Sequence, residues 1–449
     1  MFVKPFRYER AESLAAAAAV LRGSGGGAKI IAGGQSLLPM MNLGLLDLES
    51  VIDVSHIAEA RGVSSEDGFL RIGALTRHRD VQADPLVHAH QPLLSAAASN
   101  VGSPRIRARG TLGGSLAHSD PSAELPLAMT ALGAEYELSD GVTSRTVAAD
   151  AFHLSYFTTA LNQDELMVSI RVPMLGPGWG WGFREVSRRP GDFAIVASAA
   201  LLRVAGGEIV ESRVALAGVS ERPLRLGEVE SALTGASPGP SRPRRRHRRT
   251  GPRVRHQRHG GSPATPRTGP HAPGARRCVL EGRGGRMKPV TSTDMAVTMT
   301  VNGRSVTRVA GGHVTLLRWL RDEAGVFDPK YGCGEGVCGA CTVLVDGEPA
   351  SACIVLAAQC EGSEVLTAAG LTGPDGELNV LQRAFHERHG AQCGFCTPGM
   401  LMCATAMLAD GRTRTRDQIR EELHGNLCRC TGYQPIVDAI EDAQRAIPR

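Results

Sequence analysis

The stretch Tyr331–Val343, which reads YGCGEGVCGACTV, places three cysteines and four glycines within thirteen residues. This glycine content disfavours a helix, because glycine loses more backbone freedom on folding than any other residue. Thiols this close together are expected to form disulfides, to bind zinc, to perform catalysis or to hold iron and sulfide. The fold and the function of the surrounding sequence depend on which of these applies.

The spacing of the cysteines favours iron and sulfide. The three in the loop read C-x4-C-x2-C and a fourth follows in the next expected strand, as in plant-type [2Fe–2S] ferredoxins: Cys333, Cys338, Cys341 and Cys353. The glycines permit the positive φ angles and close backbone approach that wrapping a cluster requires: Gly332, Gly334, Gly336 and Gly339. Zinc sites usually pair two C-x2-C knuckles, and this loop has one. We therefore predict a [2Fe–2S] cluster here.

A second set of cysteines lies nearer the C-terminus, as Cys393-Gly-Phe-Cys396 and Cys428-Arg-Cys430. Taken alone, these spacings also suit a zinc site, and the first pair suits a dithiol redox motif. Cys396 precedes an expected helix with Thr397 as N-cap, where the positive end of the helix dipole favours thiolates. Two such loops facing each other could hold one further [2Fe–2S] cluster.

The sequence around the cysteines predicts a small sheet followed by helices. Val297–Val309 reads as a hairpin around Asn302-Gly303, and His313–Ala324 as a helix. Strands are expected at Thr342–Val345 and Cys353–Ala357. Helices follow from Asn379, and the later ones include a capping box from Thr415 to Gln418 and an amphipathic stretch from Ile436 to Ala446.

The first 235 residues alternate short strands and helices, and two glycine turns stand out among them. A helix is expected at Glu12–Arg22, with strands at Lys29–Ile31, Ser50–Val54, Phe69–Ile72, Leu166–Val172 and Ala194–Val204. The turns lie in KIIAGGQSLLP (29–39) and RGTLGGSLAHSDP (109–121). Exposed backbone N–H groups at such turns can hold a diphosphate. Neither turn is GxGxxG, which disfavours a Rossmann fold.

Residues 236–286 interrupt this pattern with a basic, Pro/Arg-rich sequence. They hold fourteen arginines and one acidic residue, so they contribute +13 to the net charge of +5 and leave −8 on the rest. We expect a disordered linker rather than a nucleic-acid arm, because no aromatic or structured partner accompanies the basic residues. A sequence rich in arginine, proline, histidine and glycine also arises when GC-rich coding DNA is translated in the wrong frame. A second hypothesis is therefore a frameshift that joined two proteins before Met287.

Length and composition place the chain among multidomain globular proteins. Its 449 residues exceed the roughly 250–300 residues that one core supports. No apolar run reaches the roughly 20 residues that span a bilayer, and the N-terminal sequence has no signal features, so we expect a cytoplasmic protein without a membrane span. Clustered cysteines in the cytoplasm are more often metal ligands or redox groups than disulfides.

Three cysteine motifs, in order, resemble the iron–sulfur part of the molybdenum hydroxylases, which include xanthine dehydrogenase and aerobic carbon monoxide dehydrogenase. The motifs are YGCGEGVCGACTV, AQCGFCTPGM and HGNLCRCTGYQPI, within residues 295–449. The resemblance implies a β-grasp ferredoxin domain and a helical-bundle domain, each with one [2Fe–2S] cluster. It also implies that Gln392 and Cys430 face a molybdopterin on a partner subunit.

The glycine turns and FREVSRRPGDFAIV (183–196) resemble the flavin-binding subunit of the same family, whose fold is the vanillyl-alcohol-oxidase (PCMH-type) FAD domain. The resemblance implies FAD, with Asp120 at its ribityl or phosphate region and Arg184 and His118 near the flavin. The residues implied around the diphosphate are Ala32, Gly33, Gly34, Gln35, Ser36, Leu37, Leu38, Thr111, Leu112, Gly113, Gly114 and Ser115.

The expected architecture is thus α+β and multidomain, a fusion of a medium and a small subunit. The domains are an FAD-binding domain (1–176), a truncated flavoprotein C-terminal domain (177–235), the linker (236–294), a ferredoxin-type domain (295–371) and a helical [2Fe–2S] domain (372–449).

The implied function is electron transfer. Electrons would pass from a molybdopterin large subunit through the Cys393 set and then the Cys333 set to FAD, and on to quinone, oxygen or NAD. The resemblance implies a dimer of the complex and assigns no catalytic residue to this chain. The alternative is a self-contained flavin and iron–sulfur reductase that takes electrons from NAD(P)H.

Overall fold

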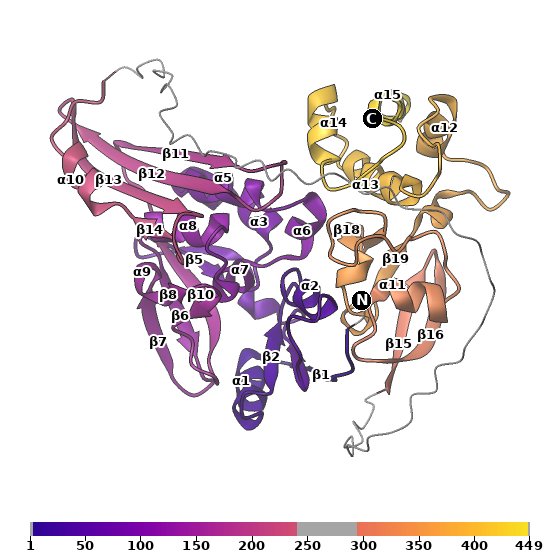
Figure 1. Ribbon diagram of the computed structural model, residues 1–449, viewed down its shortest axis with the longest axis horizontal. Coiled ribbons are helices and arrows are strands. Elements are labelled where there is room, and N and C mark those ends of the chain that lie inside the picture. Colours follow the sequence, from indigo (N-terminus) through magenta and orange to yellow (C-terminus); the bar gives the residue numbers. More distant parts are fainter. Residues whose placement is uncertain (1–2, 240–293, 448–449) are drawn as a thin grey trace, which may run out of the picture. The chain divides into compact units, whose positions relative to one another are not determined.

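The computed structural model describes residues 3–239 and 294–447, called here the N-terminal half and the C-terminal half (Figure 1). Most of the predicted linker, including Cys278, lies outside the described residues. Within the described residues the two halves belong to one compact unit. Each half is mixed in strands and helices, which confirms the predicted multidomain α+β class.

The N-terminal half begins with a parallel sheet in the order β1-β3-β2. Its strands are β1 (Arg7–Arg10), β2 (Ala28–Ile31) and β3 (Ser50–Asp53), with helices α1 (Leu14–Gly23) and α2 (Leu37–Asn42) and a short turn η1 (Ala58–Ala60). Ser13 caps α1 by accepting a hydrogen bond from Ala16 N. These elements confirm the helix and the two strands predicted here. Because the strands are parallel, the segments that follow them lie at one edge of the sheet.

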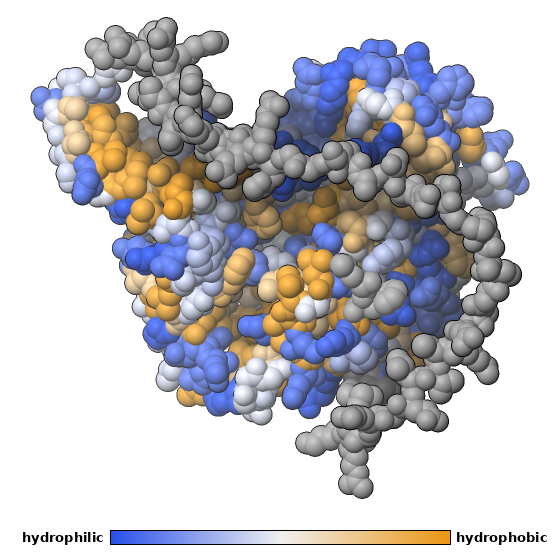
Figure 2. All heavy atoms as spheres, viewed as in Figure 1, coloured by the Kyte–Doolittle hydropathy of each residue, from blue (hydrophilic) through white to orange (hydrophobic). Residues whose placement is uncertain are grey.

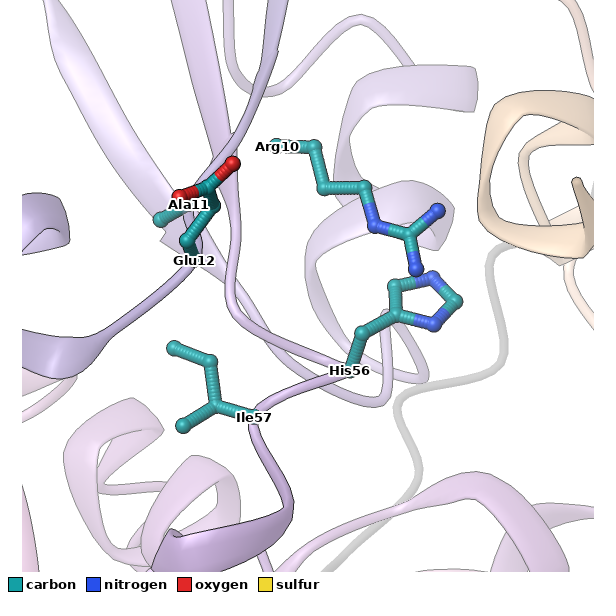
Figure 3. A pocket seen from close by; sticks show the side chains of 5 residues that line it. All are labelled: Arg10, Ala11, Glu12, His56 and Ile57. Atoms are coloured by element: carbon teal, nitrogen blue, oxygen red, sulfur yellow. The ribbon is translucent and has the colours of Figure 1, made fainter.

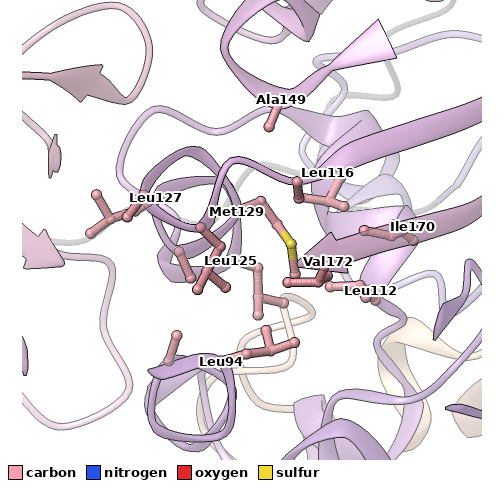
Figure 4. Close-up of a cluster of buried hydrophobic side chains, with 14 of the residues drawn as sticks. Leu94, Leu112, Leu116, Leu125, Leu127, Met129, Ala149, Ile170 and Val172 are labelled. Carbon is pink, nitrogen blue, oxygen red and sulfur yellow. The ribbon is translucent and has the colours of Figure 1, made fainter. Parts of the chain in front are cut away.

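A five-stranded antiparallel sheet follows, in the order β4-β5-β10-β6-β7. Its strands are β4 (Val63–Glu66), β5 (Phe69–Gly73), β6 (Glu135–Ser139), β7 (Ser144–Ala148) and β10 (Leu166–Pro173). The helices are α3 (His78–Ala83), α4 (Pro85–His90), α5 (Pro92–Asn100), α6 (Pro104–Arg109), α7 (Leu112–His118), α8 (Glu124–Leu132) and α9 (Ala149–Phe152), with a small hairpin of β8 (His153–Ser155) and β9 (Thr158–Thr159). Leu94, Met129 and Ile170 belong to the core between sheet and helices (Figure 4).

A third sheet completes the N-terminal half, in the order β11-β12-β13-β14. It comprises β11 (Trp179–Val186), β12 (Val196–Ala205), β13 (Glu208–Ala217) and β14 (Leu224–Arg225), followed by α10 (Gly227–Leu233). Ala197, Ala199 and Leu201 are buried on one face of β12 as part of the N-terminal core. The view in Figure 2 shows a gathering of apolar side chains over this sheet.

The C-terminal half opens with a mixed sheet in the order β16-β15-β19-β17-β18. Its strands are β15 (Asp294–Val301), β16 (Arg304–Gly311), β17 (Thr342–Val345), β18 (Glu348–Ser351) and β19 (Glu364–Leu366). The predicted hairpin is confirmed, and its turn residues Asn302 and Gly303 have φ of 49° and 78°. Both angles are positive, as a two-residue hairpin turn with Asn-Gly requires.

The predicted helix at His313–Ala324 is only partly correct. Thr315 forms an isolated β-bridge with Leu356 that keeps it extended, so α11 (Leu316–Arg318) begins later than expected. The helix then widens into the π-helical turn η2 (Trp319–Glu323). Short 3₁₀ turns complete the domain: η3 (Ala352–Ile354), η4 (Ala357–Cys360) and η5 (Ala368–Leu371).

Four helices form the last domain: α12 (Val380–Glu387), α13 (Thr397–Ala409), α14 (Arg416–Glu422) and α15 (Gln434–Ala446). The predicted capping box from Thr415 to Gln418 is confirmed at α14. The predicted N-cap at Thr397 is wrong by one residue, because Cys396 is the N-cap of α13 and makes no side-chain capping bond. Among the described residues, no helix is long and apolar enough to cross a membrane.

Candidate cofactor sites

The glycines of the loop Gly332–Cys341, called here the ferredoxin loop, serve two purposes. Gly334, Gly336 and Gly339 have φ of 75°, 79° and 73°, so they supply the predicted left-handed turns. Gly332 is not among the positive-φ residues, but a Cβ there would lie 2.7 Å from the sulfur of Cys338. It is therefore needed for close approach rather than for its backbone angle. The backbone N–H groups of Glu335 and Cys338 point at the Cys333 sulfur, at 3.3 and 3.4 Å.

The four thiols of the first predicted set meet at one place. The Cys338 thiol hydrogen-bonds with Cys333, and the Cys353 thiol bonds with Cys333 and Cys341. Bonds from Cys338 and Cys353 hold the pKa of Cys333 well below its usual range. The thiolate is the form that binds metal, so this environment suits a metal ligand.

Cys353 reaches the other thiols from a different element than predicted. The sequence suggested a strand at Cys353–Ala357, but β18 ends at Ser351 and Cys353 lies in the 3₁₀ turn Ala352–Ile354. A continued strand would keep its side chains alternating across the sheet. The turn instead takes the chain out of the ladder, and Cys353 is buried beside the ferredoxin loop.

The second predicted set also converges, from the two loops expected. The sulfurs of Cys430 and Cys393 are 3.4 Å apart, and Cys396 hydrogen-bonds with Cys428. Burial, reinforced by the bond to Cys428, raises the pKa of Cys396 to about 12. The sulfur of Cys428 accepts a 3.4 Å bond from Thr431 N. The second set is more open than the first, because Cys393 and Cys430 are exposed.

The geometry of both sets bears on the zinc alternative. Among the described residues, no group of three or more cysteine, histidine, aspartate or glutamate side chains is arranged to hold a metal ion. A [2Fe–2S] cluster distributes four thiolates over two iron atoms and two sulfides, so its ligands need not surround a single point. The convergence of four thiols in each set fits such clusters.

The two glycine turns of the N-terminal half lie against each other. A Cβ on Gly33 would overlap the carbonyl of Arg109 and the Cα of Gly110. Arg77 forms an isolated bridge with Thr111, and its side chain donates to the Arg109 carbonyl. Thr111 in turn caps α7 by accepting from Gly114 N at 3.2 Å. The structure thus brings the predicted FAD segments 32–38 and 111–115 into one neighbourhood.

Basic groups crowd this neighbourhood, where Asp80 and Asp53 are the acids that act on Arg77. Burial lowers the pKa of Arg77 to about 9, and repulsion from Arg109 and Arg61 contributes to the same shift. Gln35 Oε1 and Arg109 Nε are two of the ten buried side-chain polar atoms in the described residues that have no hydrogen-bond partner. An anionic diphosphate would balance the charge and bond to such a donor. The residues present therefore fit FAD.

The remaining predicted flavin residues are placed as follows. Asp120 follows Ser119, whose backbone is in the left-handed region with a φ of 54°. The Asp120 carboxylate accepts a 2.8 Å hydrogen bond from Ser122 N. The ring of His118 packs on Phe157 with centroids 5.1 Å apart, and burial lowers the pKa of His118. Arg184 is exposed on β11, where its Nη1 donates to the carbonyl of Phe183. The roles of Asp120 and Arg184 toward FAD stay predictions.

A cavity of about 470 Å³ that the sequence did not suggest opens beyond β1 and β3. Its lining comprises Arg10, Ala11, Glu12, His56 and Ile57, and the Arg10 guanidinium lies beside the His56 ring (Figure 3). Asp53 is fully buried nearby and accepts a 2.5 Å bond from the Tyr8 hydroxyl. Burial lowers the pKa of His56, while the Asp53 carboxylate opposes that shift.

Sequence reasoning also missed the residues that join the two halves. Asn42 Nδ2 donates to the carbonyls of Gly334 and Cys353, at 2.8 and 3.2 Å. Gln359 Nε2 donates to the Ala32 carbonyl at 3.3 Å, and Arg105 bonds to Asn426. The partners are far apart in the chain, so no local pattern could have indicated them. One apolar cluster contains residues of both halves, such as Leu38 and Trp319.

Four family models match this chain. Residues 4–175 match the FAD binding domain in molybdopterin dehydrogenase, and 181–244 match the CO dehydrogenase flavoprotein C-terminal domain. Residues 299–368 match the 2Fe-2S iron-sulfur cluster binding domain, and 367–441 match the [2Fe-2S] binding domain. The predicted FAD and two [2Fe–2S] clusters are therefore confirmed as the cofactors of these domains.

Curated relatives match one half each. The carbon monoxide dehydrogenase medium chain of Hydrogenophaga pseudoflava is 39% identical over 230 residues, which are 51% of this chain and 80% of that protein. The caffeine dehydrogenase subunit gamma of Pseudomonas sp. (strain CBB1) is 49% identical over 148 residues, which are 32% of this chain and 88% of that protein.

A solved structure agrees with the first of these. Carbon monoxide dehydrogenase from Hydrogenophaga pseudoflava, lacking the Mo-pyranopterin moiety, matches 53% of this chain and 83% of its own with a TM-score of 0.52 at 39% identity. The chain is an oxidoreductase component that belongs to the molybdenum hydroxylase family, and it unites in one polypeptide the FAD and [2Fe–2S] domains that match separate subunits of its relatives.

Proposed function

We propose that this chain is the electron-transfer component of a molybdenum hydroxylase complex. A separate large subunit would bind molybdopterin and oxidise the substrate, and this chain would deliver the electrons to an acceptor. When bound, the clusters carry single electrons and the flavin collects two. The chain's own residues hold these groups in order and limit their contact with water.

Contacts between the two cluster-binding segments support the first step of this order. Leu427 N donates to the carbonyl of Cys338 at 2.9 Å, which joins a residue beside Cys428 to the ferredoxin loop. A Cβ on Gly399 would overlap the carbonyl of Gly339, so the start of α13 lies against the same loop. The segments that carry the second set of thiols are therefore packed on the ferredoxin loop.

Contacts of the ferredoxin loop with the N-terminal half support the second step, from the ferredoxin-type cluster to FAD. Asn42, at the end of α2, donates to the ferredoxin loop and to the Cys353 carbonyl. Ile106, on the helix that precedes the turn 111–115, lies beside Gly336: a Cβ there would be 3.7 Å from Ile106 Cδ1. The ferredoxin loop therefore touches both the helical domain and the segments that flank the FAD turns.

The exposure of the second thiol set supports the proposal that electrons from the partner subunit enter the chain at this set. Cys393 and Cys430 are exposed, and Phe395 between the motif cysteines is 48% exposed. Cys341 and Cys353, in contrast, are buried. A partner subunit could approach the exposed set, whereas the buried set is accessible mainly through the protein. Gln392 is also exposed, which agrees with the proposal that it faces the partner.

The observation that carries the proposal is that the ferredoxin loop contacts both the helical domain and the segments that flank the FAD turns. The test uses the full chain co-expressed with its large subunit and mixed anaerobically with carbon monoxide, caffeine and nicotine, which the names of its relatives suggest. With the substrate that bleaches the flavin, Cys341→Ser is expected to leave the second cluster reducible and the flavin oxidised. Flavin bleaching at the unmodified rate in this variant would refute the order.

The acceptor distinguishes the main proposal from its alternative. Quinone, oxygen and NAD all remain candidates for the acceptor, and the complex is proposed to be dimeric and cytoplasmic. A self-contained flavin and iron–sulfur reductase would instead take electrons from NAD(P)H. Two anaerobic measurements test this: bleaching of the flavin of the isolated chain by NADH at a turnover rate, together with no reoxidation of the substrate-reduced complex by NAD, would favour the alternative.

A further inference from the structure

Arg105 is a buried arginine through which the N-terminal half contacts both cluster-binding segments. Its side chain comes from α6 and is 1% exposed. Nε donates to Ser351 Oγ at 2.9 Å, Nη1 donates to Asn426 Oδ1, and Nη2 donates to the Gly425 carbonyl. Ser351 directly precedes the turn that carries Cys353, and Asn426 lies two residues before Cys428.

The partners of Arg105 extend the contact into the ferredoxin loop from two directions. The Ser351 hydroxyl donates to the Gly336 carbonyl at 3.4 Å. The Asn426 amide donates to the carbonyls of Gly339 and Gly399, at 3.3 and 3.0 Å. The guanidinium therefore bonds directly to the segment that precedes Cys428, and it reaches the ferredoxin loop through Ser351 and Asn426.

All the hydrogen-bond partners of Arg105 are neutral. They are a hydroxyl, an amide oxygen and a backbone carbonyl, and among the described residues no carboxylate lies within ion-pair distance of Arg105. Burying a cation without an anion is costly, and such cations usually have a counter-ion.

A bound [2Fe–2S] cluster is the anion that this site lacks. Four thiolates and two sulfides outweigh the charge of two ferric ions, so the cluster and its ligands are negative as a unit, and reduction adds one more negative charge. A fixed buried cation stabilises the reduced form more than the oxidised form. It should therefore raise the reduction potential of the cluster beside it.

We infer that Arg105 is a positioning residue that supplies the counter-charge of the ferredoxin-type cluster from the flavin-binding half of the chain. Docking of the two halves then sets the reduction potential of the ferredoxin-type cluster as well as the position of that cluster relative to FAD. The inference rests on the proposed ligands Cys333, Cys338, Cys341 and Cys353, but not on the direction of electron flow or on the identity of the substrate.

The test compares Arg105→Gln, which removes the charge, with Arg105→Lys, which keeps it. Arg107→Gln is the control on the same helix: among the described residues the Arg107 side chain donates to the carbonyls of Val101 and Gly102, and its charge interacts with Glu421 and Glu422. The full-length protein with iron and FAD bound is titrated potentiometrically and followed by low-temperature EPR. A soluble paramagnetic lanthanide complex assigns the two signals, because it should relax the cluster at exposed Cys393 and Cys430 more strongly.

The expected result is a more negative midpoint for the less accessible cluster in Arg105→Gln, with Arg105→Lys near the unmodified protein and a smaller shift in Arg107→Gln. Selective loss of that cluster from Arg105→Gln, with retention in Arg105→Lys, would equally support a counter-charge. An unchanged midpoint in Arg105→Gln, or loss of the cluster from both Arg105 variants, would overturn the inference. Failure of the unmodified protein to hold two clusters would instead overturn the proposed function.

Discussion

Glu124 is a carboxyl group held in the core at the start of α8, where it is 4% exposed. Burial, with the nearby Glu185 and Asp120, raises the pKa of Glu124 to about 8, against a smaller opposing effect of Arg107 and the backbone. The folded protein therefore keeps this group protonated at pH values where an unfolded chain loses the proton. The residue makes the stability of the N-terminal half depend on pH.

The sign of the dependence follows from the raised pKa. Below about pH 4.5 both states are protonated, and between about 4.5 and 8 only the unfolded state ionises, so the free energy of unfolding falls as pH rises. The loss is up to about 5 kcal/mol for this shift. Glu124→Gln is expected to flatten the decline.

Denaturation midpoints at about pH 5 and about pH 8, followed by release of FAD fluorescence, measure this effect. The exposed Glu228→Gln serves as the control for removing a surface carboxylate. A decline between the two pH values that is equally steep in Glu124→Gln and in the unmodified protein would show that Glu124 is not its source.

Residues within one loop could be predicted from the sequence, whereas residues in contact across the chain could not. Cys333, Cys338 and Cys341 lie within nine residues of one loop, so their spacing in the sequence largely determines how close their thiols can come. The thiols converge as predicted. Arg105 and Asn426 are 321 positions apart, and each looks like an ordinary polar residue in its own segment. Only the docked halves show that they are paired.

At the scale of elements, the docking of α13 on the ferredoxin loop depends on the absence of a side chain at Gly399. A Cβ there would overlap the Gly339 carbonyl and crowd the Cα of Ala340. The helix begins at Thr397, directly after Cys396, so its first turn holds this predicted ligand of the second cluster against the ferredoxin loop. The two cluster sites therefore share a boundary.

Gly399→Ala is expected to separate these two elements or to strain them. Overpacking of this kind typically costs about 1–3 kcal/mol, and we expect a lower melting temperature and lower iron content per chain. Thermal unfolding and iron analysis of the purified protein measure both. Gly227→Ala is a matched control, since a Cβ at Gly227 meets nothing within 4 Å. Equal behaviour of the two variants would contradict the close contact.

The elements show where periodicity is a poor guide. The strand predicted at Cys353–Ala357 has the right apolar composition, but the chain turns at Ala352–Ile354 to bring Cys353 to the other thiols. The predicted start of the helix after His313 was displaced by the β-bridge from Thr315 to Leu356. In both places a long-range contact competes with the local preference and wins.

At the scale of the whole molecule, the two halves are joined by more than the chain between them. They share an apolar cluster, the hydrogen bonds of Asn42, Gln359 and Arg105, and the ion pair of Arg79 with Glu348. The two relatives from Hydrogenophaga pseudoflava and Pseudomonas sp. match one half each. The contacts should therefore hold the halves together when the covalent link is removed.

Expression of residues 1–239 and 294–449 as two separate chains tests this expectation. We expect the chains to copurify in a one-to-one complex that contains FAD and iron. Size-exclusion chromatography with flavin and iron analysis of the peak measures it. Elution of the two chains apart, each with its own cofactors, would show that the contacts are too weak to determine the arrangement.

The central claim is that a single chain holds one FAD and two [2Fe–2S] clusters in the sites described. The most direct test is quantification of iron, acid-labile sulfide, zinc and flavin in one anaerobically purified sample of the full-length protein. The account predicts about four iron atoms, about four sulfides and about one FAD per chain, without zinc. About two iron atoms with one zinc ion would contradict the assignment of Cys393, Cys396, Cys428 and Cys430, and iron without flavin would contradict the FAD site.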